Sequence, residues 1–356
     1  MAIIKMIFAY ILCLSQIFAP VDALIVAGGE SAFFTEWSST DEFTEDYCIA
    51  LEKEPGEDFV VLNLADIQLS DDNVYGDRGE TSKAIIDKLV EDTQPDLITL
   101  SGDNAWGTVA YLELVNWLDS YNIPWAPVMG NHDGEGCMSE FWCAEVLSEA
   151  ENCLFQFGPK DMGYGNYIIN IKENGRILHT LYMLDTHSND NFVLEDGTTV
   201  DGYDHLWFNQ IEWYKWAVNG INDIAGRTVR STAIMHIPVF EYTDAWTQAW
   251  NYETNEYNPL YGLVSFGSND EGVCSSPVNN GFFEVCKELG STKDIVVGHD
   301  HLNNASILYK GIKLTYSLKT GLGSYYDTEK LGGTTLTIGT LGIPETQHHY
   351  IDVTTL

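Results

Sequence analysis

Short, almost continuous apolar runs alternate with amphipathic stretches in the first half of the chain. The apolar runs cover residues 59–65, 96–101 and 125–129, and runs of this length are typical of strands buried on both faces of a sheet. Between them, residues 80–92 and 111–121 carry apolar side chains on one side of a helix. This alternation predicts an α/β domain in which parallel strands are joined by helices.

Later in the chain the apolar runs follow one another more closely. Further strands are predicted at residues 166–171, 177–185, 229–236, 294–298, 305–309, 312–317, 333–339 and 347–353. A helix among them carries an apolar stripe made of Trp207, Ile211, Trp213, Trp216 and Val218. Such a stripe is more often the buried face of a helix than a platform for a ligand. Strands crowded without helices between them suggest a second sheet packed on the first.

The first 23 residues have the pattern of a signal peptide. Lys5 precedes an apolar run at residues 6–19, and Val21-Asp22-Ala23 offers the small residues that a signal peptidase needs. The run is shorter than the roughly 20 residues that span a bilayer. We therefore expect cleavage after residue 23, no stable membrane insertion of the mature chain, and a secreted, lumenal or vacuolar location.

Composition divides the remaining chain into two parts. Residues 24–57 are acidic and weakly patterned, and we expect them to form an N-terminal arm that is ordered only in part. No repeat or low-complexity linker divides the rest of the sequence, so residues 58–356 are expected to form one domain.

The chain as a whole is strongly acidic, with 17 Lys and Arg against 53 Asp and Glu and a formal net charge of -36. Such a surface lacks the cations that neutralise phosphates, which argues against nucleic acids and anionic membranes as partners. The charge also suits an acidic compartment, where protonation of some carboxylates relieves their repulsion. A soluble acidic secreted protein without that adaptation explains the charge equally well.

Cysteine usage agrees with export. Cys13 lies in the predicted signal peptide, and the other cysteines are Cys48, Cys137, Cys143, Cys153, Cys274 and Cys286. These six thiols can pair in 15 ways, and an exported chain can oxidise them. The local candidates are Cys274 with Cys286, and two of the cluster formed by Cys137, Cys143 and Cys153. The alternative is that some of the thiols are free and buried.

Polar residues follow five of the predicted strands, at the point where each strand ends. In chain order they are Asp66-Ile67-Gln68, Gly102-Asp103, Gly130-Asn131-His132-Asp133, His236-Ile237-Pro238 and Gly298-His299-Asp300-His301. Ligands of an open α/β sheet gather at the carboxyl ends of the strands, where the loops converge. Carboxylates, amides and imidazoles are the ligand types that suit divalent transition metals.

Each of these segments alone has an ordinary structural explanation. An Asp after a strand is usually a turn or cap residue, and His236 by itself is more often a hydrogen-bonded structural histidine than a ligand. His299 and His301 are more specific, because two imidazoles two residues apart after a strand can each reach a metal. All five segments in this order, each after its strand, indicate a metal site.

The five segments resemble those of the calcineurin-like metallophosphoesterase family, and in this chain they extend from residue 66 to residue 301. Neighbouring segments are similar to a branch of purple-acid-phosphatase-like phosphohydrolases. These segments are Phe157-Gly158-Pro159, Gly165-Asn166-Tyr167, Leu184-Asp185-Thr186, Gln210-Ile211-Glu212-Trp213-Tyr214 and His236-Ile237-Pro238. The resemblance covers roughly residues 58–353.

The resemblance implies a two-sheet β-sandwich flanked by α-helices, with two divalent metal ions (Mn, Fe, Zn or Mg) about 3.5 to 4 Å apart. It implies that the first ion is held by Asp66, Gln68, Asp103 and His301. It implies that the second ion is held by Asp103, Asn131, His236 and His299. Asp103 would therefore bridge the two ions.

For the reaction, the resemblance implies hydrolysis of a phosphomonoester or small phosphodiester by a hydroxide bound to both ions. Asp103 would take part in catalysis as the shared carboxylate. His132 has the family role of proton donor to the leaving oxygen, and an imidazole titrates in the useful range. The alternative for His132 is a structural histidine beside the site, while Asp133 either orients His132 or caps a turn.

Two positions depart from well-known members of the family. Position 106, three residues after Asp103, is Trp, whereas purple acid phosphatases have a tyrosinate iron ligand there and protein Ser/Thr phosphatases an Asp that pairs with the catalytic His. Trp106 can do neither, which argues against a purple Fe(III) enzyme and against a phosphoprotein phosphatase. Gln68 stands where many relatives have His. An amide oxygen is a harder and weaker donor than imidazole, so we expect the first ion to bind loosely or to be Mn²⁺ or Mg²⁺.

Other functions share these motifs. One alternative is a secreted lipid-headgroup or cyclic-nucleotide phosphodiesterase, and another, of a different class, is a catalytically silent secreted binding scaffold. The intact set of polar residues argues against the scaffold. Substrate choice is expected to lie in the loops at 134–165, 187–206 and 240–285. A glycosylation sequon at Asn304 is close to His301, so we do not expect it to carry a glycan.

Overall fold

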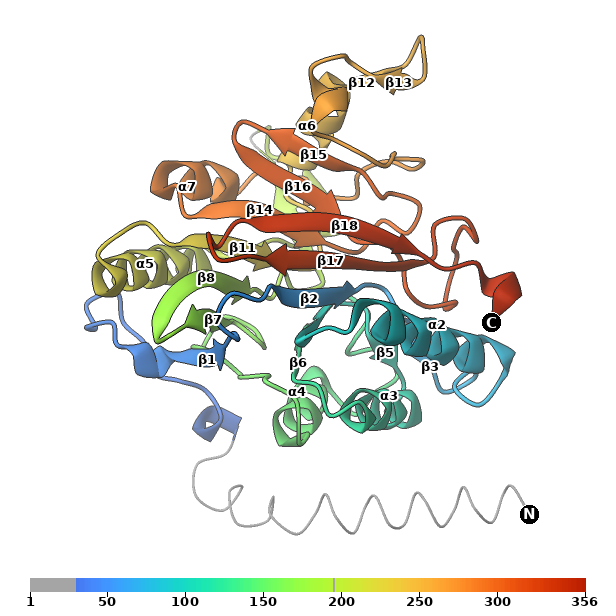
Figure 1. The fold of residues 1–356 in the computed structure, drawn as a ribbon, viewed down its shortest axis with the longest axis horizontal. Helices are drawn as coiled ribbons and strands as arrows, with labels where there is room; N and C mark the ends of the chain where they lie inside the picture. Colours follow the sequence, from blue (N-terminus) through green and yellow to red (C-terminus); the bar gives the residue numbers. More distant parts are fainter. Residues whose placement is uncertain (1–29, 195) are drawn as a thin grey trace.

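Two β-sheets pack on one another in the computed structural model, and helices cover their outer faces (Figure 1). The structure describes residues 30–194 and 196–356. The predicted signal peptide, residues 1–23, lies outside the described residues, as does the beginning of the predicted arm. Within the described ranges, no helix combines the length and the apolar character that crossing a membrane requires.

The larger sheet has seven strands in the order β1-β7-β8-β11-β14-β16-β15. Their bounds are β1 Cys48–Glu52, β7 Tyr167–Glu173, β8 Arg176–Met183, β11 Arg230–Ile234, β14 Thr292–Val297, β15 Ser306–Tyr309 and β16 Ile312–Tyr316. β8, β11, β14 and β16 run parallel to one another. β7 is antiparallel to β8, β15 is antiparallel to β16, and β1 at the edge is parallel to β7.

The smaller sheet has five strands in the order β18-β17-β2-β4-β6. Their bounds are β2 Phe59–Leu64, β4 Leu97–Ser101, β6 Trp125–Val128, β17 Gly332–Ile338 and β18 Pro344–Tyr350. β2, β4 and β6 are parallel, and α2 (Asp77–Thr93) and α3 (Thr108–Ser120) lie between them in the chain. The predicted α/β class and the predicted second sheet are therefore confirmed.

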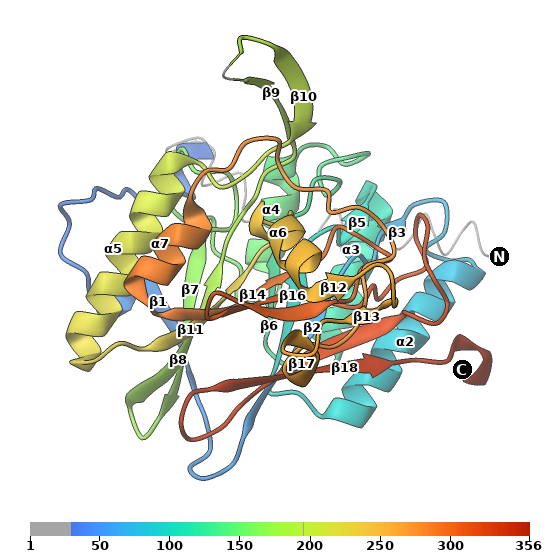
Figure 2. The same ribbon diagram turned by 90° about the horizontal axis from the view of Figure 1, so that it is seen from above.

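Further helices and short strand pairs complete the fold. The remaining α-helices of the described residues are α4 Glu140–Glu149, α5 Phe208–Ala225, α6 Glu241–Ala249 and α7 Phe282–Leu289. The short strand pairs are β3 Leu69–Ser70 with β5 Ala105–Trp106, β9 Asn189–Val193 with β10 Thr199–Tyr203, and β12 Trp250–Asn251 with β13 Glu256–Tyr257. Figure 2 shows the β9–β10 hairpin projecting away from the sheets. α4, this hairpin and α6 lie in the three loops that the sequence analysis associates with substrate choice.

The central strands are buried on both faces, as their continuous apolar runs predict. On β7, Ile169 belongs to the core between the two sheets, while its neighbour Ile168 belongs to the core beneath α5 and α7. Ile234 and Ala233 divide in the same way on β11. Successive side chains of a strand point to opposite faces, so a strand between two apolar layers needs apolar residues at every position.

The described part of the N-terminal segment packs on the domain. The ring centroids of Phe33 lie 5.3 Å from Phe141 and 5.0 Å from Phe157, and that of Phe43 lies 4.9 Å from Trp216. The same segment continues into the edge strand β1. The sequence analysis does not predict β1, because this strand is short and its side chains are only half-buried or exposed.

The six cysteines of the described residues are free thiols. The predicted pairing of Cys274 with Cys286 is wrong, because the two residues lie at opposite ends of β14. The backbone N–H of Cys274 donates to Asp300, which follows the strand, whereas Cys286 lies beside the first residue of the strand. In the other predicted cluster, the thiols of Cys137 and Cys143 are hydrogen-bonded to each other.

The sequon asparagine is buried. Asn304 Nδ2 donates to the Tyr350 hydroxyl at 3.0 Å, and Asn304 Oδ1 accepts from the backbone N–H of Ser268 at 2.7 Å. An amide engaged in this way is not available for a glycan in the folded protein, in agreement with the expectation from the sequence.

Candidate metal centre

The five predicted polar segments converge where the two sheets end side by side. Those from the five-stranded sheet follow β2, β4 and β6 and bring Asp66, Gln68, Asp103, Asn131 and His132. Those from the seven-stranded sheet follow β11 and β14 and bring His236, His299 and His301. Parallel strands of one sheet end on the same side, so their loops meet there.

Four of these residues have a left-handed backbone although none is glycine. Their φ angles are 51° at Asp66, 49° at Gln68, 51° at Asp103 and 76° at His299. Residues with side chains rarely adopt this region, and such strain is concentrated at functional sites. The packed loops therefore hold these side chains in directions that an ordinary turn would not give them.

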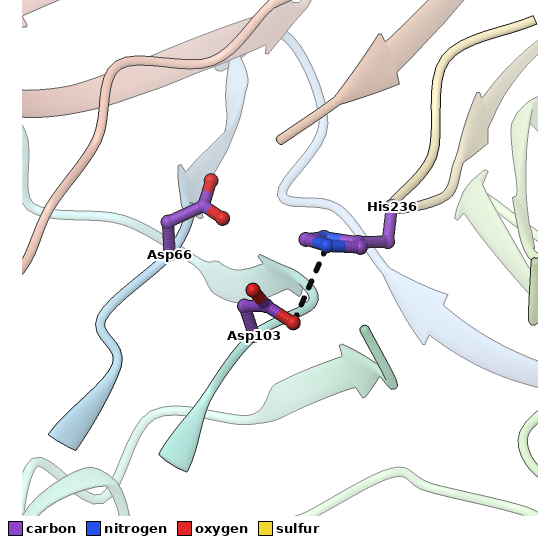
Figure 3. Close-up of side chains that lie close together, drawn as sticks. All are labelled: Asp66, Asp103 and His236. Atoms are coloured by element: carbon purple, nitrogen blue, oxygen red, sulfur yellow. Dashed lines mark ion pairs between the residues drawn. The ribbon is translucent and has the colours of Figure 1, made fainter. Parts of the chain in front are cut away.

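Asp66, Asp103 and His236 form the centre of the site (Figure 3). One ligand atom of each lies within 4.8 Å of those of the other two, and all three residues are buried. Nε2 of His236 is 3.3 Å from Oδ1 of Asp103. The two carboxylates and the imidazole point into the same space.

Three more predicted ligands border this centre. Nε2 of His301 is 3.4 Å from Oδ1 of Asp66. Oδ1 of Asn131 and Nδ1 of His299 lie 3.0 Å and 3.2 Å from Nε2 of His236. The structure therefore gathers six of the seven predicted ligands with oxygen or nitrogen acceptors facing one another.

Backbone carbonyl groups fix the orientation of two of the imidazoles. Nδ1 of His236 is 2.9 Å from the Ser101 carbonyl, and Nδ1 of His301 is 2.9 Å from the Tyr325 carbonyl. A carbonyl only accepts, so each Nδ1 must carry the proton, and Nε2 of the neutral ring is left with a lone pair. In each ring that lone pair faces a carboxylate, an arrangement that requires a proton or a cation between them. Metal-binding histidines are oriented in this way.

The charges of the site favour a bound cation. Burial lowers the pKa of His236, but the Asp103 and Asp66 carboxylates outweigh burial and raise the pKa above its ordinary value. Burial and the neighbouring His236 lower the pKa of His299 to about 3, so His299 is a neutral base. Its buried Nε2 has no hydrogen-bond partner among the described residues. Because an unpaired buried acceptor is costly, these residues fit a divalent cation.

Gln68 lies at the centre, but the nitrogen of its amide, and not the oxygen, points toward Asp103. Its Nε2 donates to Oδ2 of Asp103 at 2.9 Å, and its Oε1 accepts from Nζ of Lys319 at 2.7 Å. Lys319 is buried, and burial lowers its pKa to about 8. The oxygen that would bind a metal is therefore engaged by an ammonium group.

His132 lies at the rim of the centre, where a substrate can reach it. Its side chain is 40% exposed, and its Nδ1 lies 3.0 Å from a carboxylate oxygen of Glu135. Its backbone N–H donates to Oδ1 of Asp103 at 2.9 Å, so the His132 loop is tied to the central carboxylate. Its ring lies edge-on to that of Trp106, with centroids 5.7 Å apart.

Asp133 does not orient His132. Its carboxylate accepts from the backbone N–H groups of Asn104, Ala105 and Gly130 at 3.0, 3.2 and 2.6 Å. Burial, followed by the charge of Asp103, raises the pKa of Asp133 to about 7. Asp133 therefore fastens the loop after β4 to the loop after β6 and fixes the positions of Asp103 and Asn131.

The sequence pattern of calcineurin-like phosphoesterases matches residues 59–311, which is more than half of the chain and includes every residue of the centre. The protein belongs to the calcineurin-like phosphoesterase family. Members of this family use divalent metal ions, in agreement with the Asp and His group described above.

Two relatives illustrate the range of this family. Phosphatase DCR2 of Saccharomyces cerevisiae is 29% identical over 239 residues, covering 63% of this chain and 39% of that protein. A protein named probable inactive purple acid phosphatase 14 in Arabidopsis thaliana is 28% identical over 269 residues, covering 68% of this chain and 62% of that protein. The chain thus spans less than two thirds of the length of these relatives. A dimetal phosphatase from Danio rerio has a TM-score of 0.46 and 12% identity, covering 81% of this chain and 98% of that chain.

Beside the phosphoesterase centre lies a pocket of about 740 Å³. It adjoins Gly130 and Ser188, and the Ser188 hydroxyl donates to the Asn131 carbonyl at 3.1 Å. Its wall includes Trp207, whose ring stacks on His187 with centroids 3.9 Å apart. The expectation that the α5 stripe is buried therefore holds for Ile211, Trp213 and Val218 but not for Trp207, which is 39% exposed.

Sequence reasoning misses three residues that shape this centre. Lys319 lies in a segment after β16 that contains no motif of the resemblance. The signal for a tight loop there is the pair of glycines in Thr320-Gly321-Leu322-Gly323, directly after Lys319. Glu135 follows His132 by three residues in an ordinary turn. Tyr203 comes from the β9–β10 hairpin, and its ring packs edge-on against that of His299 with centroids 4.3 Å apart.

Proposed function

We propose that this protein hydrolyses small phosphate esters, either phosphomonoesters or small phosphodiesters, with two divalent cations bound at the centre. The observation that carries the proposal is the convergence of buried polar atoms on Nε2 of His236. Oδ1 of Asp103, Oδ1 of Asn131 and Nδ1 of His299 lie 3.3, 3.0 and 3.2 Å from it. Family membership supports the same chemistry.

The donor set divides into two positions that share Asp103. The first position would use Asp66, Asp103 and His301, with Gln68 beside them but its oxygen engaged by Lys319. The second would use Asp103, Asn131, His236 and His299. When bound, the cations would activate a water molecule and neutralise the non-bridging oxygens of the phosphate.

His132 is the proposed proton donor to the leaving oxygen. Its half-exposed ring stands at the edge of the buried centre, and its backbone is fixed to Asp103. The carboxylate of Glu135 lies 3.0 Å from Nδ1 and would hold the ring in place, which leaves Nε2 to donate a proton to the leaving oxygen. General acid catalysis of this kind contributes about 10²- to 10⁴-fold to the rate.

The adjoining pocket supports a small substrate. A volume of about 740 Å³ accommodates the organic part of a phosphate ester of modest size. Its charged lining includes Glu140, Asp185 and Asp204 against Lys160. This acidic lining would repel a polyanion, which agrees with the expectation that nucleic acid is not a substrate.

A catalytically silent scaffold is the second candidate, because three relatives from Arabidopsis thaliana bear the name of a probable inactive purple acid phosphatase. The two candidates differ in whether the protein turns over a phosphate ester.

The test begins with removal of metals and dialysis into defined Mn²⁺, Zn²⁺ or Mg²⁺. Hydrolysis of p-nitrophenyl phosphate and of its bis ester is then measured together with metal content. We expect metal-dependent hydrolysis of at least one ester, and the ratio of the two rates then distinguishes a monoesterase from a diesterase. Two ions per chain without hydrolysis of either ester would overturn the enzyme and favour the scaffold.

Export is part of the proposal, supported by the signal-peptide pattern of residues 1–23 and the acidic composition. We expect the protein purified from its natural source to begin near residue 24. N-terminal sequencing of that protein provides the test, and an intact leader would contradict it.

A further inference from the structure

Lys319 is a buried lysine at the metal centre, outside the set of ligands. Only 3% of the Lys319 surface is exposed. Its Nζ donates to the backbone carbonyl of Asp66 at 2.8 Å and to Oε1 of Gln68 at 2.7 Å. A buried charge with two short hydrogen bonds has a defined place, so its effect on the centre can be worked out.

The backbone around Lys319 is pressed against the loop that carries Asp66 and Gln68. A Cβ atom at Gly321 would lie 1.8 Å from the Ile67 carbonyl oxygen, and one at Gly323 would lie 2.0 Å from that of Gln68. Only glycine allows this approach, since no side chain fits between the two segments. The ammonium group is therefore held beneath the metal loop.

Lys319 determines which face of the Gln68 amide points into the centre. In the observed orientation, Oε1 meets the ammonium and Nε2 meets the Asp103 carboxylate. Turning the amide over would place its N–H₂ against the ammonium and its oxygen against the carboxylate, and both contacts would be repulsive. Gln68 consequently presents a group without a lone pair to Asp103 and cannot bind a metal there.

Lys319 also adds a positive charge beside the carboxylates of the first position. Glu271 is the other acidic group whose charge acts on Lys319, besides Asp66 and Asp103. Glu271 is itself engaged, since it accepts from the Leu302 N–H at 2.7 Å and from the Tyr325 hydroxyl at 2.9 Å. A dication entering between Asp66 and Asp103 would meet this ammonium, whereas the second position is bordered by neutral Asn131 and His299.

We propose that Lys319 makes the two metal positions unequal, by withholding the Gln68 oxygen and by placing a positive charge next to the first position. This inference rests on the proposed two-cation centre. The second position, with four protein ligands, binds its ion tightly, and the first, with Asp66, Asp103 and His301 alone, binds its ion weakly. Lys319 is thus a positioning residue that controls how many ions the centre holds.

The test is titration of metal-free full-length protein with Mn²⁺ by isothermal calorimetry, with metal content measured after dialysis. We expect one tight and one weak ion in the unaltered protein. Lys319→Met keeps the length of the side chain but removes the charge and frees the amide. The weak ion should then bind about tenfold more tightly or better, as removal of a unit charge near a dication implies, while the tight ion stays nearly unchanged.

Gln68→Leu supplies an independent arm that does not depend on the folding of the Lys319 variant. In the unaltered background it should leave the weak ion nearly unaffected, because Gln68 does not bind it. Combined with Lys319→Met, it should cancel most of the gain, because the freed amide is then missing. Loss of an ion from Gln68→Leu alone would overturn the inference.

A matched control is Lys53→Met, which removes a second buried lysine, one that pairs with Glu173 away from the centre. It should not change either binding constant. Two ions of equal affinity in the unaltered protein, or an unchanged weak ion in folded Lys319→Met, would overturn the role of Lys319 and leave the proposed hydrolase standing. Failure to bind any ion would instead overturn the proposed metal centre itself.

Discussion

The carboxylate of Glu135 lies 3.0 Å from Nδ1 of His132. In protein Ser/Thr phosphatases the carboxylate partner of the catalytic histidine comes from the position that Trp106 occupies here. Trp106 packs edge-on against the His132 ring instead. The chain therefore supplies an aromatic contact from one loop and a carboxylate from another.

His132→Ala should keep the bound metal ions but slow turnover most for substrates with poor leaving groups. General acid catalysis contributes about 10²- to 10⁴-fold, and an activated phenol needs little of it. The measurement is the rate on an alkyl phosphate compared with p-nitrophenyl phosphate, with metal content determined in parallel. Equal losses on both substrates would remove the proton-donor role.

Glu135→Gln should act in the same direction as the loss of His132 but more weakly. The side chain of Glu135 is 63% exposed, so water already screens most of its charge. We expect a severalfold loss on the alkyl phosphate, because the contact with Nδ1 that helps to hold the His132 ring in place is weakened. Glu151→Gln, at another exposed glutamate, is the control. A Glu135 variant whose rate on the alkyl phosphate coincides with that of the control would show that the contact has no role in turnover.

The part of the centre that depends on strand ends is predictable from the sequence. Asp66, Asp103 and His236 each follow a strand that a continuous apolar run identifies, and parallel strands bring their ends together. The orientation of Gln68 is not predictable in this way, because it depends on Lys319, which lies about 250 residues later in the chain and reaches it through contacts between the sheets. Sequence spacing gives no sign of such a long-range contact.

The fold likewise has a part that the sequence predicts and a part that it does not. The central strands of both sheets are buried on two faces and have strong apolar patterns, so their bounds are predicted within a few residues. β1 is half-exposed at an edge, and its pairing with β7 depends on a surface that only the assembled sheet provides. By spacing, Trp207 belongs to the apolar stripe of α5. It lies at the N-terminus of the helix, however, and its indole ring stacks on His187 and lines the pocket.

Asp294→Asn should make the protein more stable at neutral pH. Asp294 lies on β14, and its carboxylate accepts from the hydroxyls of Thr315 and, across the sheets, Thr346. Burial raises the pKa of Asp294 to about 7. The folded state therefore holds a proton that the unfolded state releases near pH 4, and the contribution of Asp294 to stability falls as the pH rises from about 4 to about 7.

The variant cannot titrate at this position, so its advantage over the unaltered protein should grow across that interval and reach a few kcal/mol at most. Urea unfolding of both proteins at a series of pH values, with a chelator present, measures the difference. Asp223→Asn, at an exposed carboxylate, is the control. A difference between the two proteins that stays constant with pH would contradict the raised pKa.

Asp103→Asn should be the most damaging single change at the centre. Oδ1 of Asp103 accepts from the His132 N–H and faces His236, while its Oδ2 accepts from the Gln68 amide. An asparagine has one oxygen for these donors, so its N–H₂ must meet another N–H, and Lys319 prevents the Gln68 amide from turning to relieve the contact.

The same substitution removes the negative charge that both cation positions would share, so metal occupancy and rate should fall together. Removal of His301 or His236 should weaken mainly one ion each. The measurement is metal stoichiometry and phosphate-ester turnover of each purified variant, with circular dichroism as the check on folding and Asp294→Asn as the control for loss of a buried carboxylate elsewhere. Because the amide is nearly the size of the carboxylate, packing should survive, so a loss of metal reflects the lost charge and the lost acceptor oxygen at this position and not unfolding. Folded Asp103→Asn protein that still binds two ions and turns over normally would show that Asp103 does not bridge them.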